Sequence, residues 1–180
     1  MTRRFSPSAA LLRAGKLDHS VMVRLRTWRH PRLTLFFRTV THLGSPAFFA
    51  VMVVSFWFLS TPLSMHLLRR LPASGVAYLT SEVIKRLFTR RRPQLAMTEF
   101  ESLIHTPRDH SFPSGHAAVT VAAAVAFAGA DLRVTLGSAL IASLVCFSRI
   151  YLGVHFLLDV AAGAVLGAAC GIVAPLLSFS

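Results

Sequence analysis

Residues 148–159, SRIYLGVHFLLD, place an arginine, a histidine and a carboxylate at short, fixed intervals. Arg149 precedes His155 by six residues, and Asp159 follows the histidine by four. If the second half of this segment is helical, His155 and Asp159 lie one turn apart on the same face, so that the carboxylate can hydrogen-bond one ring nitrogen and leave the other free to attack. Arg149 supplies a planar set of donors for an oxyanion. The segment therefore predicts nucleophilic catalysis on an anionic substrate.

Two upstream segments carry cations and small residues that suit the same chemistry. In KRLFTRRRP, Lys85 and Arg92 are seven residues apart, a spacing of two helical turns that predicts a shared helix face. In PSGH, Ser114 and Gly115 precede His116, and the proline and small residues indicate a helix start whose backbone N–H groups can approach an anion. Both segments therefore predict phosphate binding, with a second histidine beside the anion.

The composition predicts an integral membrane protein. The 180 residues suit a single domain, and 54% of them are hydrophobic while 14% are charged. Together with a mean hydropathy of +0.59, this is too apolar and too poor in charge for an ordinary soluble domain. The net charge of +12 comes from cations at the N-terminus and in the motif segments. This clustering indicates membrane-flanking and phosphate-binding roles and argues against nucleic-acid binding.

Apolar segments predict an all-α fold, a polytopic bundle of transmembrane helices. Five stretches are expected to span the membrane: residues 46–63, 71–88, 114–130, 134–150 and 156–178. Residues 31–44 are apolar but short and carry Arg38 and His42, so we expect them to enter the interface or form a re-entrant segment. A sixth span would have to be built from that region. Five spans place all three motif segments at one membrane face. Charged residues at that depth in the membrane are energetically costly unless paired or hydrated, so their convergence indicates function.

Residues 1–44 are expected to form an interfacial N-terminal segment ahead of a helical catalytic core at 45–180, all within one domain. Leu17, Val21, Leu25 and Trp28 recur at helical spacing among arginines. This pattern is typical of an amphipathic helix on an anionic membrane surface. A polar tail with accidental periodicity is the alternative.

The last predicted span contains Gly163, Gly167 and Gly171, which recur every fourth residue. Small residues at this spacing let two helix backbones approach closely. We therefore expect another helix of the bundle to pack on this face.

Residues 90–111 form the longest polar connection and are expected to act as a lid or a route for substrate access. The ionisable residues of the connection fall outside the motifs, so they are expected to be solvated: Glu99, Glu101, His105, Arg108, Asp109 and His110. Arg86, Arg90 and Arg91 also fall outside the motifs, and we expect them to be membrane-flanking cations.

The three motif segments together read K-x6-RP, PSGH and SR-x5-H-x3-D. In this order and spacing they resemble the type 2 phosphatidic acid phosphatase superfamily, which also includes bacterial acid phosphatases and vanadium haloperoxidases. The resemblance covers residues 85–159 and implies catalysis by the matching residues without a metal cofactor. The residues themselves agree, because no carboxylate cluster of the kind that holds magnesium accompanies the motifs.

Hydrolysis of a phosphomonoester requires charge neutralisation, an in-line nucleophile and an acid for the leaving oxygen. The expected phosphate clamp combines three cations with two backbone amides: Lys85, Arg92, Arg149, Ser114 and Gly115. We expect His155 to attack phosphorus and form a phosphohistidine, while Asp159 fixes the tautomer of His155 and stabilises its imidazolium. His116 is expected to protonate the leaving alkoxide and then to activate water.

The leading functional hypothesis is a multi-pass enzyme of the plasma (inner) membrane that removes phosphate from a lipid. Candidate substrates are phosphatidate, phosphatidylglycerophosphate, undecaprenyl diphosphate, lipid A and other polyprenyl phosphates. A lipid phosphotransferase using the same histidine is one alternative, and a noncatalytic lipid-binding membrane protein is another. No sequence feature predicts the oligomeric state.

The charge distribution and the family resemblance give opposite predictions for the side of the membrane that the site faces. The segment up to Arg38 is rich in Lys and Arg, whereas the opposite side of a five-span chain carries Arg69, Arg70 and Arg133. The positive-inside rule then predicts a cytoplasmic N-terminus and a cytoplasmic active site. The resemblance to bacterial enzymes of envelope lipids, which commonly have six spans, implies a periplasmic site instead.

Overall fold

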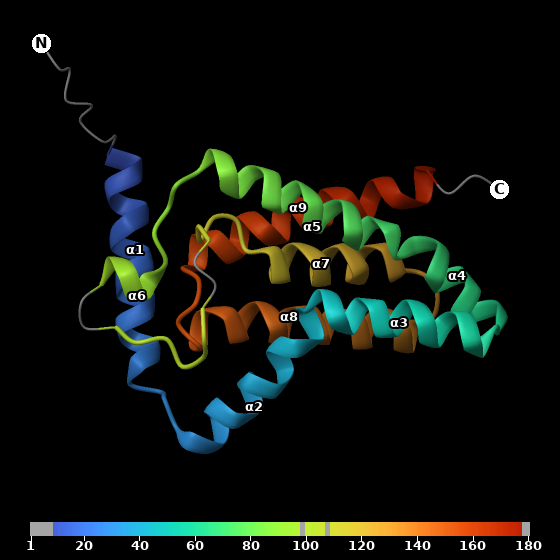
Figure 1. The fold of residues 1–180 in the computed structure, drawn as a ribbon, viewed down its shortest axis with the longest axis horizontal. Coiled ribbons are helices and arrows are strands. Elements are labelled where there is room, and N and C mark those ends of the chain that lie inside the picture. Colours follow the sequence, from blue (N-terminus) through green and yellow to red (C-terminus); the bar gives the residue numbers. More distant parts are fainter. Residues whose placement is uncertain (1–8, 98–99, 107–108, 178–180) are drawn as a thin grey trace, which may run out of the picture.

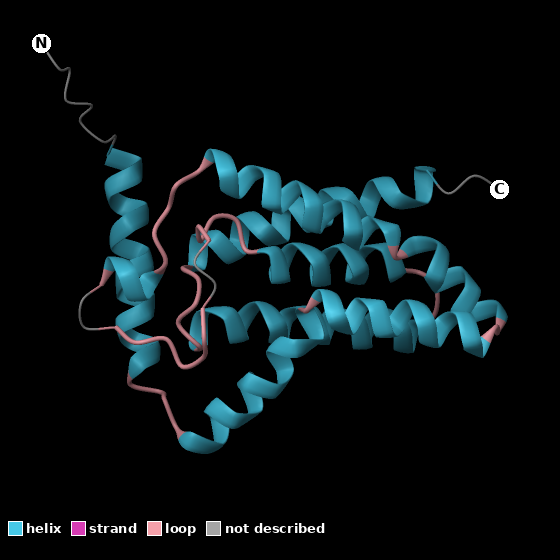
Figure 2. Cartoon of the chain, viewed as in Figure 1, coloured by secondary structure: helices cyan, strands magenta, loops and turns pink. Residues whose placement is uncertain are grey.

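In the computed structural model, residues 9–97, 100–106 and 109–177 are described, and their secondary structure is entirely helical (Figures 1 and 2). The elements in chain order are α1 (Ala9–Arg26), α2 (Pro31–Thr41), the 3-10 helix η1 (His42–Gly44), α3 (Pro46–Leu59), α4 (Pro62–Arg70), α5 (Pro72–Leu87), α6 (Pro93–Ala96), α7 (Gly115–Phe127), α8 (Leu132–Tyr151) and α9 (Leu157–Leu177). The predicted all-α class is confirmed for these residues. Helices α3, α5, α7, α8 and α9 run along the long axis of the molecule (Figure 1).

Helix α7 lies at the centre of the bundle and packs against α9, α8 and α5. The glycines of α9 face the backbone of α7: a Cβ atom at Gly163 or Gly167 would overlap the carbonyl oxygen of Ser114 or Ala118. At Gly171 the corresponding Cβ atom would lie 2.7 Å from a carbonyl oxygen of α7. The predicted close-packing glycine face is therefore confirmed, with α7 as its partner.

Among the described helices, α8 alone is long and apolar enough to cross a membrane by itself. The segment Pro31–Gly44 and α3 meet the same criterion when taken together, but they are bent by 60°. The bend lies where the Ser45 side chain caps α3 and Pro46 occupies its first turn, because both residues favour a new helix start. Residues 31–44 thus form a helix that is angled against the bundle and ends at its active-site end.

The predicted span 46–63 was wrong at its C-terminal end, because α3 ends at Leu59. Ser60 adopts a left-handed conformation with φ of 48°, and Thr61 then opens α4 with a reciprocal capping box to Ser64. Helix α4 turns back to α7, where Arg70 donates a hydrogen bond to the carbonyl oxygen of Ala126 at 2.6 Å. This contact satisfies a carbonyl in the last turn of α7.

Helix α1 lies across the end of the bundle at which the motif segments meet (Figure 1). Its packed face differs from the predicted apolar stripe: Asp18 and Met22 are 1% and 0% exposed, whereas Leu17 and Trp28 are 49% and 55% exposed. Of the predicted stripe, Leu25 is buried, at 7% exposure, and Val21 is partly buried. Of the face that was expected to lie on a membrane, one part therefore packs against the protein and the other part is exposed.

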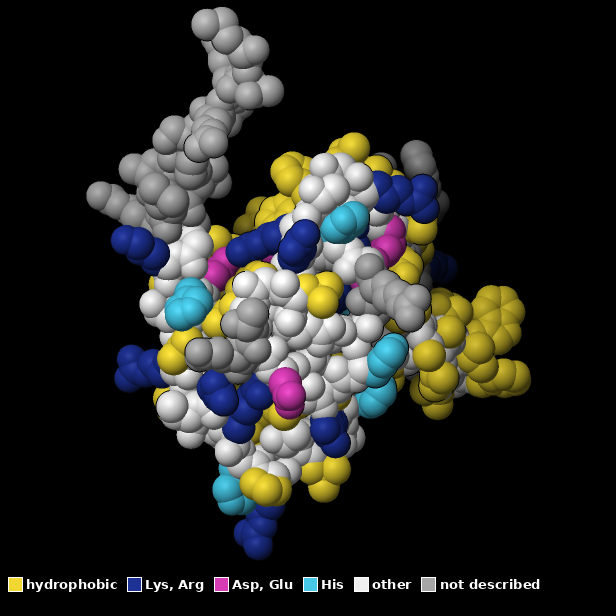
Figure 3. Space-filling model, turned by 60° about the vertical axis from the view of Figure 1, so that its left-hand side comes forward, with side chains coloured by type: hydrophobic (Ala, Val, Ile, Leu, Met, Phe, Trp, Pro, Cys, Tyr) yellow, Lys and Arg dark blue, Asp and Glu magenta, His cyan; other side chains and the backbone are white. Residues whose placement is uncertain are grey.

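The surface near α1 is basic, while another face is apolar. Figure 3 shows Lys and Arg side chains scattered over the end of the molecule that carries α1, and hydrophobic side chains that protrude at one side. The most exposed hydrophobic residues include Phe58 and Trp57 near the end of α3, at 81% and 66%. An apolar flank beside a cationic end is typical of a protein in contact with lipid.

Candidate active site

Six charged or polar residues of the predicted site are buried, together with Gly115, at the end of the bundle where α5 and α8 end and α7 and α9 begin (Figure 1). They are Lys85, Arg92, Ser114, Arg149, His155 and Asp159. Buried charges are unfavourable unless they are paired or bind a charged ligand. Their convergence therefore marks a candidate anion site.

His155 lies in the short turn between α8 and α9 rather than within α9. Its Nδ1 is 2.8 Å from the carbonyl oxygen of Ser111, a contact in which Nδ1 carries the proton and donates it. Its Nε2 is 3.4 Å from Nη1 of Arg92, and only an unprotonated Nε2 can accept from a guanidinium. Both contacts assign the lone pair of His155 to Nε2, on the side of the cations.

The expected hydrogen bond between His155 and Asp159 was wrong in its geometry. The Oδ2 atom of Asp159 lies 3.8 Å from Nδ1, beyond hydrogen-bond distance, and Ser111 takes the place of the acceptor. The reason is that α9 starts at Leu157, so His155 and Asp159 are not stacked on one helix. The carboxylate instead accepts from the N–H of Phe156 at 2.9 Å and serves as a nearby negative charge.

The electrostatic surroundings keep His155 neutral near neutral pH. Burial lowers the pKa of His155 to about 4, and the charges of Arg149 and Arg92 act in the same direction, while Asp159 opposes them. A neutral imidazole with a free Nε2 is the nucleophilic form of histidine.

Lys85 and Arg92 meet, but not on a common helix face as predicted. Helix α5 ends at Leu87, and the two cations converge on Asp109 of the following connection. The Asp109 carboxylate lies 3.0 Å from Nζ of Lys85 and 2.6 Å from Nη2 of Arg92. The expectation that Asp109 is a solvated loop residue was therefore wrong.

The negatively charged carboxylate of Asp109 lies between the two cations Lys85 and Arg92. Burial on its own would raise the pKa of Asp109, but hydrogen bonds and charge from Lys85 and Arg92 outweigh it and hold the pKa below its usual value. Arg92 also donates from Nε to the Asp109 carbonyl oxygen at 3.1 Å and from Nη1 to the Val154 carbonyl oxygen at 3.0 Å. These contacts aim the Arg92 guanidinium at the turn that carries His155.

The PSGH segment starts a helix, as predicted, with Ser114 at the N-cap of α7 and Gly115 as its first residue. The expected role of the Ser114 amide was wrong, because its N–H donates to the carbonyl oxygen of Asp159 at 2.9 Å. The Ser114 hydroxyl is instead buried with no hydrogen-bond partner among the described residues. A Cβ atom at Gly115 would lie 3.8 Å from Nζ of Lys85, which places the start of α7 beside that cation.

Arg149 and His116 complete the site from α8 and α7. Nη1 of Arg149 donates to Oγ1 of Thr41 at 2.6 Å, and its buried Nε has no partner among the residues that the structure describes. His116 lies under the electrostatic influence of Arg149, His155, Lys85 and Arg92. Its ring packs against Gly44, where a Cβ atom would come within 3.1 Å of Cδ2. Two buried donors without partners among the described residues, on Arg149 and Ser114, thus belong to a site that also contains two histidines.

Arg90 and Asp18 belong to the surroundings of the site, although neither was predicted to do so. Nη1 of Arg90 lies 2.6 Å from Oδ1 of Asp159, and Nη2 of Arg90 forms an ion pair with the buried Asp18. The assignment of Arg90 as a membrane-flanking cation was therefore wrong. One sequence signal was available, because Asp18 is the only acidic residue before Glu82 in a strongly basic stretch.

The described residues contain no group of three or more His, Cys, Asp or Glu side chains that could hold a metal ion. The positive charge acting on His155 comes from Arg92 and Arg149, and Lys85 joins both arginines in acting on His116. The arrangement can bind a tetrahedral anion with three cationic groups while a neutral histidine approaches its central atom.

Several known proteins resemble the chain in sequence. Over 96 residues it is 41% identical to the decaprenylphosphoryl-5-phosphoribose phosphatase of Mycobacterium tuberculosis, a match that covers 53% of this chain and 52% of that protein. The match thus spans about half the length of the mycobacterial protein. Over 155 residues it is 32% identical to phosphatidylglycerophosphatase B of Bacillus subtilis, with 77% of this chain and 72% of that protein covered.

Two solved structures share the fold. The transmembrane PAP2 type phosphatidylglycerolphosphate phosphatase of Bacillus subtilis aligns with a TM-score of 0.74 at 26% identity, over 93% of this chain and 86% of that one. Aquifex aeolicus LpxE aligns with a TM-score of 0.74 at 28% identity, over 89% of this chain and 95% of that one. A family model described as the PAP2 superfamily matches residues 66–179, a range that contains all three motif segments. The chain therefore belongs to the PAP2 superfamily.

Proposed function

We propose that the protein is a membrane-embedded phosphatase that hydrolyses a phosphomonoester or diphosphate on a lipid through a phosphohistidine. The observation that carries the proposal is the state of His155: Nδ1 donates to Ser111 at 2.8 Å, and the free Nε2 faces Arg92 at 3.4 Å. The relatives support the reaction class, because they are named as phosphatases of decaprenylphosphoryl-5-phosphoribose and phosphatidylglycerophosphate.

In the first step of the proposed reaction, Nε2 of His155 bonds to phosphorus as the bond from phosphorus to the lipid oxygen breaks. Lys85, Arg92 and Arg149 neutralise the phosphoryl oxygens, and the Ser114 hydroxyl and the N–H of Gly115 add donors at the start of α7. Asp159 balances the positive charge that develops on His155. The phosphate must first displace the Asp109 carboxylate from Lys85 and Arg92.

His116 transfers the protons in this proposal. It gives a proton to the leaving alkoxide, and in the second step it takes a proton from the water that attacks the phosphohistidine. The products are a dephosphorylated lipid and inorganic phosphate, and His155 returns to its neutral form. No step requires a metal ion or another cofactor.

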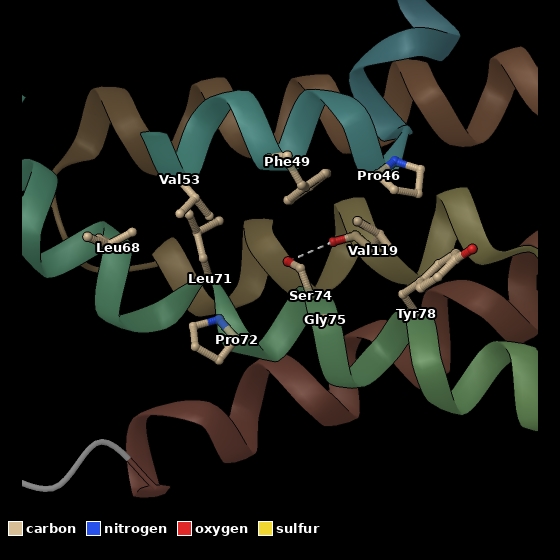
Figure 4. A pocket seen from close by; sticks show the side chains of 11 residues that line it. Pro46, Phe49, Val53, Leu68, Leu71, Pro72, Ser74, Gly75, Tyr78 and Val119 are labelled. Atoms are coloured by element: carbon tan, nitrogen blue, oxygen red, sulfur yellow. Dashed lines mark hydrogen bonds between the residues drawn. The ribbon is translucent and has the colours of Figure 1, made fainter. Parts of the chain in front are cut away.

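An apolar cavity beside the site supports a lipid substrate. It has a volume of about 430 Å³ and lies between α3 and α5, with Phe49 on one side and Tyr78 on the other (Figure 4). Tyr78 is two helical turns from Lys85 on α5, and Val119 at the back of the cavity is one turn from His116 on α7. A hydrocarbon chain in this cavity would leave its phosphate near the cations.

We further propose that the chain is a multi-pass protein of the plasma (inner) membrane in which α3, α5, α7, α8 and α9 cross the bilayer. The common direction of these helices in Figure 1 supports this arrangement, as does the location of all motif segments at one end. Helices α1 and α2 then lie at the same membrane face as the active site. The basic N-terminal segment favours the cytoplasmic side for that face.

The proposed function is tested by phosphate release from a panel of lipids by the purified protein in detergent with EDTA. The panel contains phosphatidate, phosphatidylglycerophosphate, undecaprenyl diphosphate and a polyprenyl-phosphate sugar. We expect release from at least one lipid, inhibition by vanadate, and loss of turnover in His155→Ala. Complete loss of activity in EDTA with recovery on adding magnesium, or wild-type release by His155→Ala, would contradict the mechanism.

Labelling and product analysis distinguish hydrolysis from transfer. With a radioactive phosphate on the lipid, the wild type should carry an acid-labile, base-stable label that is absent from His155→Ala. Label that moves to an added acceptor lipid instead of water would identify a phosphotransferase. Binding of the lipids without release or transfer of phosphate would identify a noncatalytic protein.

A further inference from the structure

The carboxylate of Asp18 lies deep in the protein although it belongs to the N-terminal helix α1, outside the residues that the family model matches. Asp18 is 1% exposed, and its Oδ2 forms an ion pair with Nη2 of Arg90. Its Oδ1 accepts a hydrogen bond from the N–H of Leu158 at 3.1 Å, an amide in the first turn of α9. Asp18 therefore binds both the connection after α5 and the helix that carries Asp159.

Arg90 links Asp18 to the two groups that flank His155. Its side chain reaches Oδ1 of Asp159 at 2.6 Å, with its guanidinium 4.5 Å from the ring centre of Phe156. Its carbonyl oxygen accepts from the N–H of Ser111 at 2.9 Å, and the carbonyl of Ser111 is the acceptor for His155. A displacement of Arg90 would therefore disturb both the acceptor of the Nδ1 proton and the nearby carboxylate.

The charges of this group also indicate a role beyond packing. Two buried carboxylates, Asp18 and Asp159, share one guanidinium, so the three groups carry a net negative charge next to His155. Without Asp18, Arg90 would neutralise Asp159 alone, and the net charge of this group would be zero instead of negative. A histidine that gains positive charge during the reaction is stabilised by the first arrangement and not by the second.

We propose that Asp18 is a positioning residue of the active site: it holds Arg90 against Asp159 and so fixes the surroundings of His155 from outside the matched domain. The inference rests on the proposed phosphatase function. It assigns α1 a part in turnover as well as in packing. The residue acts through Arg90 and does not touch the substrate.

The same helix provides a matched control. Met22 is one helical turn from Asp18 and is also fully buried, in an apolar cluster with Leu25, Phe100 and Phe156. Met22→Ala opens a cavity under α1 but leaves the ion pairs of Arg90 in place. The variant therefore measures how weaker packing of α1 affects activity while the ion pairs of Arg90 are unchanged.

The test compares Asp18→Asn, Asp18→Glu and Met22→Ala with the wild type, using the panel lipid that the wild type hydrolyses best. Asp18→Asn should lower kcat by about 10- to 100-fold while KM stays within about twofold, because the cations that bind phosphate are retained. Asp18→Glu should recover part of the lost rate. Met22→Ala should lower the melting temperature and keep the wild-type kcat.

A double variant separates action through Asp159 from an independent effect. If Asp18 acts through Arg90 on Asp159, Asp18→Asn combined with Asp159→Asn should be no slower than Asp159→Asn alone. If Asp18→Asn does not fold, Arg90→Lys provides the test, because a single ammonium cannot bridge both carboxylates and kcat should again fall. The inference would be overturned if the losses in kcat from the two substitutions multiply in the double variant. It would also be overturned if Asp18→Asn and Arg90→Lys both keep the wild-type kcat.

The failure of this inference is distinct from the failure of the proposed function. A wild-type protein that releases no phosphate from any lipid of the panel refutes the phosphatase. A wild-type protein that turns over while Asp18→Asn matches it refutes only the positioning role.

Discussion

The α7–α9 pair and the polar cover, defined as α1 together with the described residues between 88 and 113, meet at the same active site but are held by different contacts. In the α7–α9 pair, glycines of α9 bring the two backbones together, and no side chain separates them at Gly163 or Gly167. The polar cover has an apolar cluster of its own around Met22 and Phe100, but it is also held by ion pairs and hydrogen bonds, such as Arg90 with Asp18 and Arg92 with Asp109. Close packing fixes distances without regard to solution conditions, whereas charged contacts respond to pH and to a competing anion.

This difference suits the tasks of the two regions. The α7–α9 pair fixes Ser114 relative to Asp159, through a hydrogen bond of 2.9 Å between the amide of the first and the carbonyl of the second. The polar cover supplies Arg92 and the carboxylate of Asp109. Under the proposed function, phosphate displaces this carboxylate from Lys85 and Arg92. A rigid half therefore holds Ser114 and Asp159 beside the nucleophile, and a responsive half admits the anion.

The largest effect is expected from a break in the α7–α9 pair. Gly167→Leu places a side chain into the carbonyl of Ala118, so the helices must separate, and we expect a loss of roughly 3 kcal/mol or more in the free energy of unfolding. Thermal unfolding in detergent measures it. The control is Gly137→Leu on α8, where a Cβ atom meets nothing within 4 Å, and which should melt like the wild type. Equal melting temperatures of the two variants would show that the α7–α9 contact accommodates a side chain at position 167.

A smaller effect is expected from acid acting on His155, which lies between the two regions. The native pKa of His155 is about 4, below the 6.5 of an unperturbed histidine, so the unfolded chain binds the proton first and stability falls as pH falls from about 6.5 to about 4. From about pH 7 to about pH 4.5 the loss should be roughly 2 to 3 kcal/mol. Melting curves of the wild type and His155→Gln at both pH values test this. The variant should lose less stability on acidification, and an equal loss would contradict the expectation.

The smallest effect is expected in the polar cover, at Asp109. Asp109→Asn removes the negative charge that competes with phosphate for Lys85 and Arg92, so inorganic phosphate should inhibit about 10-fold more tightly, or about 1.4 kcal/mol. Inhibition constants from steady-state assays measure the change, with Glu101→Gln from the same connection as the control. Unchanged or weaker inhibition in Asp109→Asn would mean that the carboxylate does not occupy the anion site.

The parts of the site that could be predicted from the sequence are those set by local spacing. Ser114 and Gly115 start a helix because capping depends on neighbouring residues, and the glycines of α9 face one helix because they recur every fourth residue. Membership of the PAP2 superfamily also followed from short motifs at fixed offsets. Each of these inferences needs only a few consecutive residues.

The rest depends on how the connection after α5 folds back, which no local pattern determines. Lys85 and Arg92 both pair with the carboxylate of Asp109. They do not lie on a common helix face, because α5 ends before Arg92. The partner of Arg90 on α1 is 72 residues away in the sequence. Such pairings are set by tertiary packing, and only the isolation of Asp18 among basic residues hinted at them.

The two ends of that connection also close on each other. The N–H of Ser111 donates to the carbonyl oxygen of Arg90 at 2.9 Å, and Arg92 binds both the backbone and the side chain of Asp109. The described residues 93–97 and 100–106 therefore lie beyond a closed neck. For protein engineering, a replacement of this stretch from a homologue has to keep Phe100 in its buried apolar cluster and the hydrogen bond from the N–H of Leu103 to Leu152, while the neck keeps the catalytic ends in register.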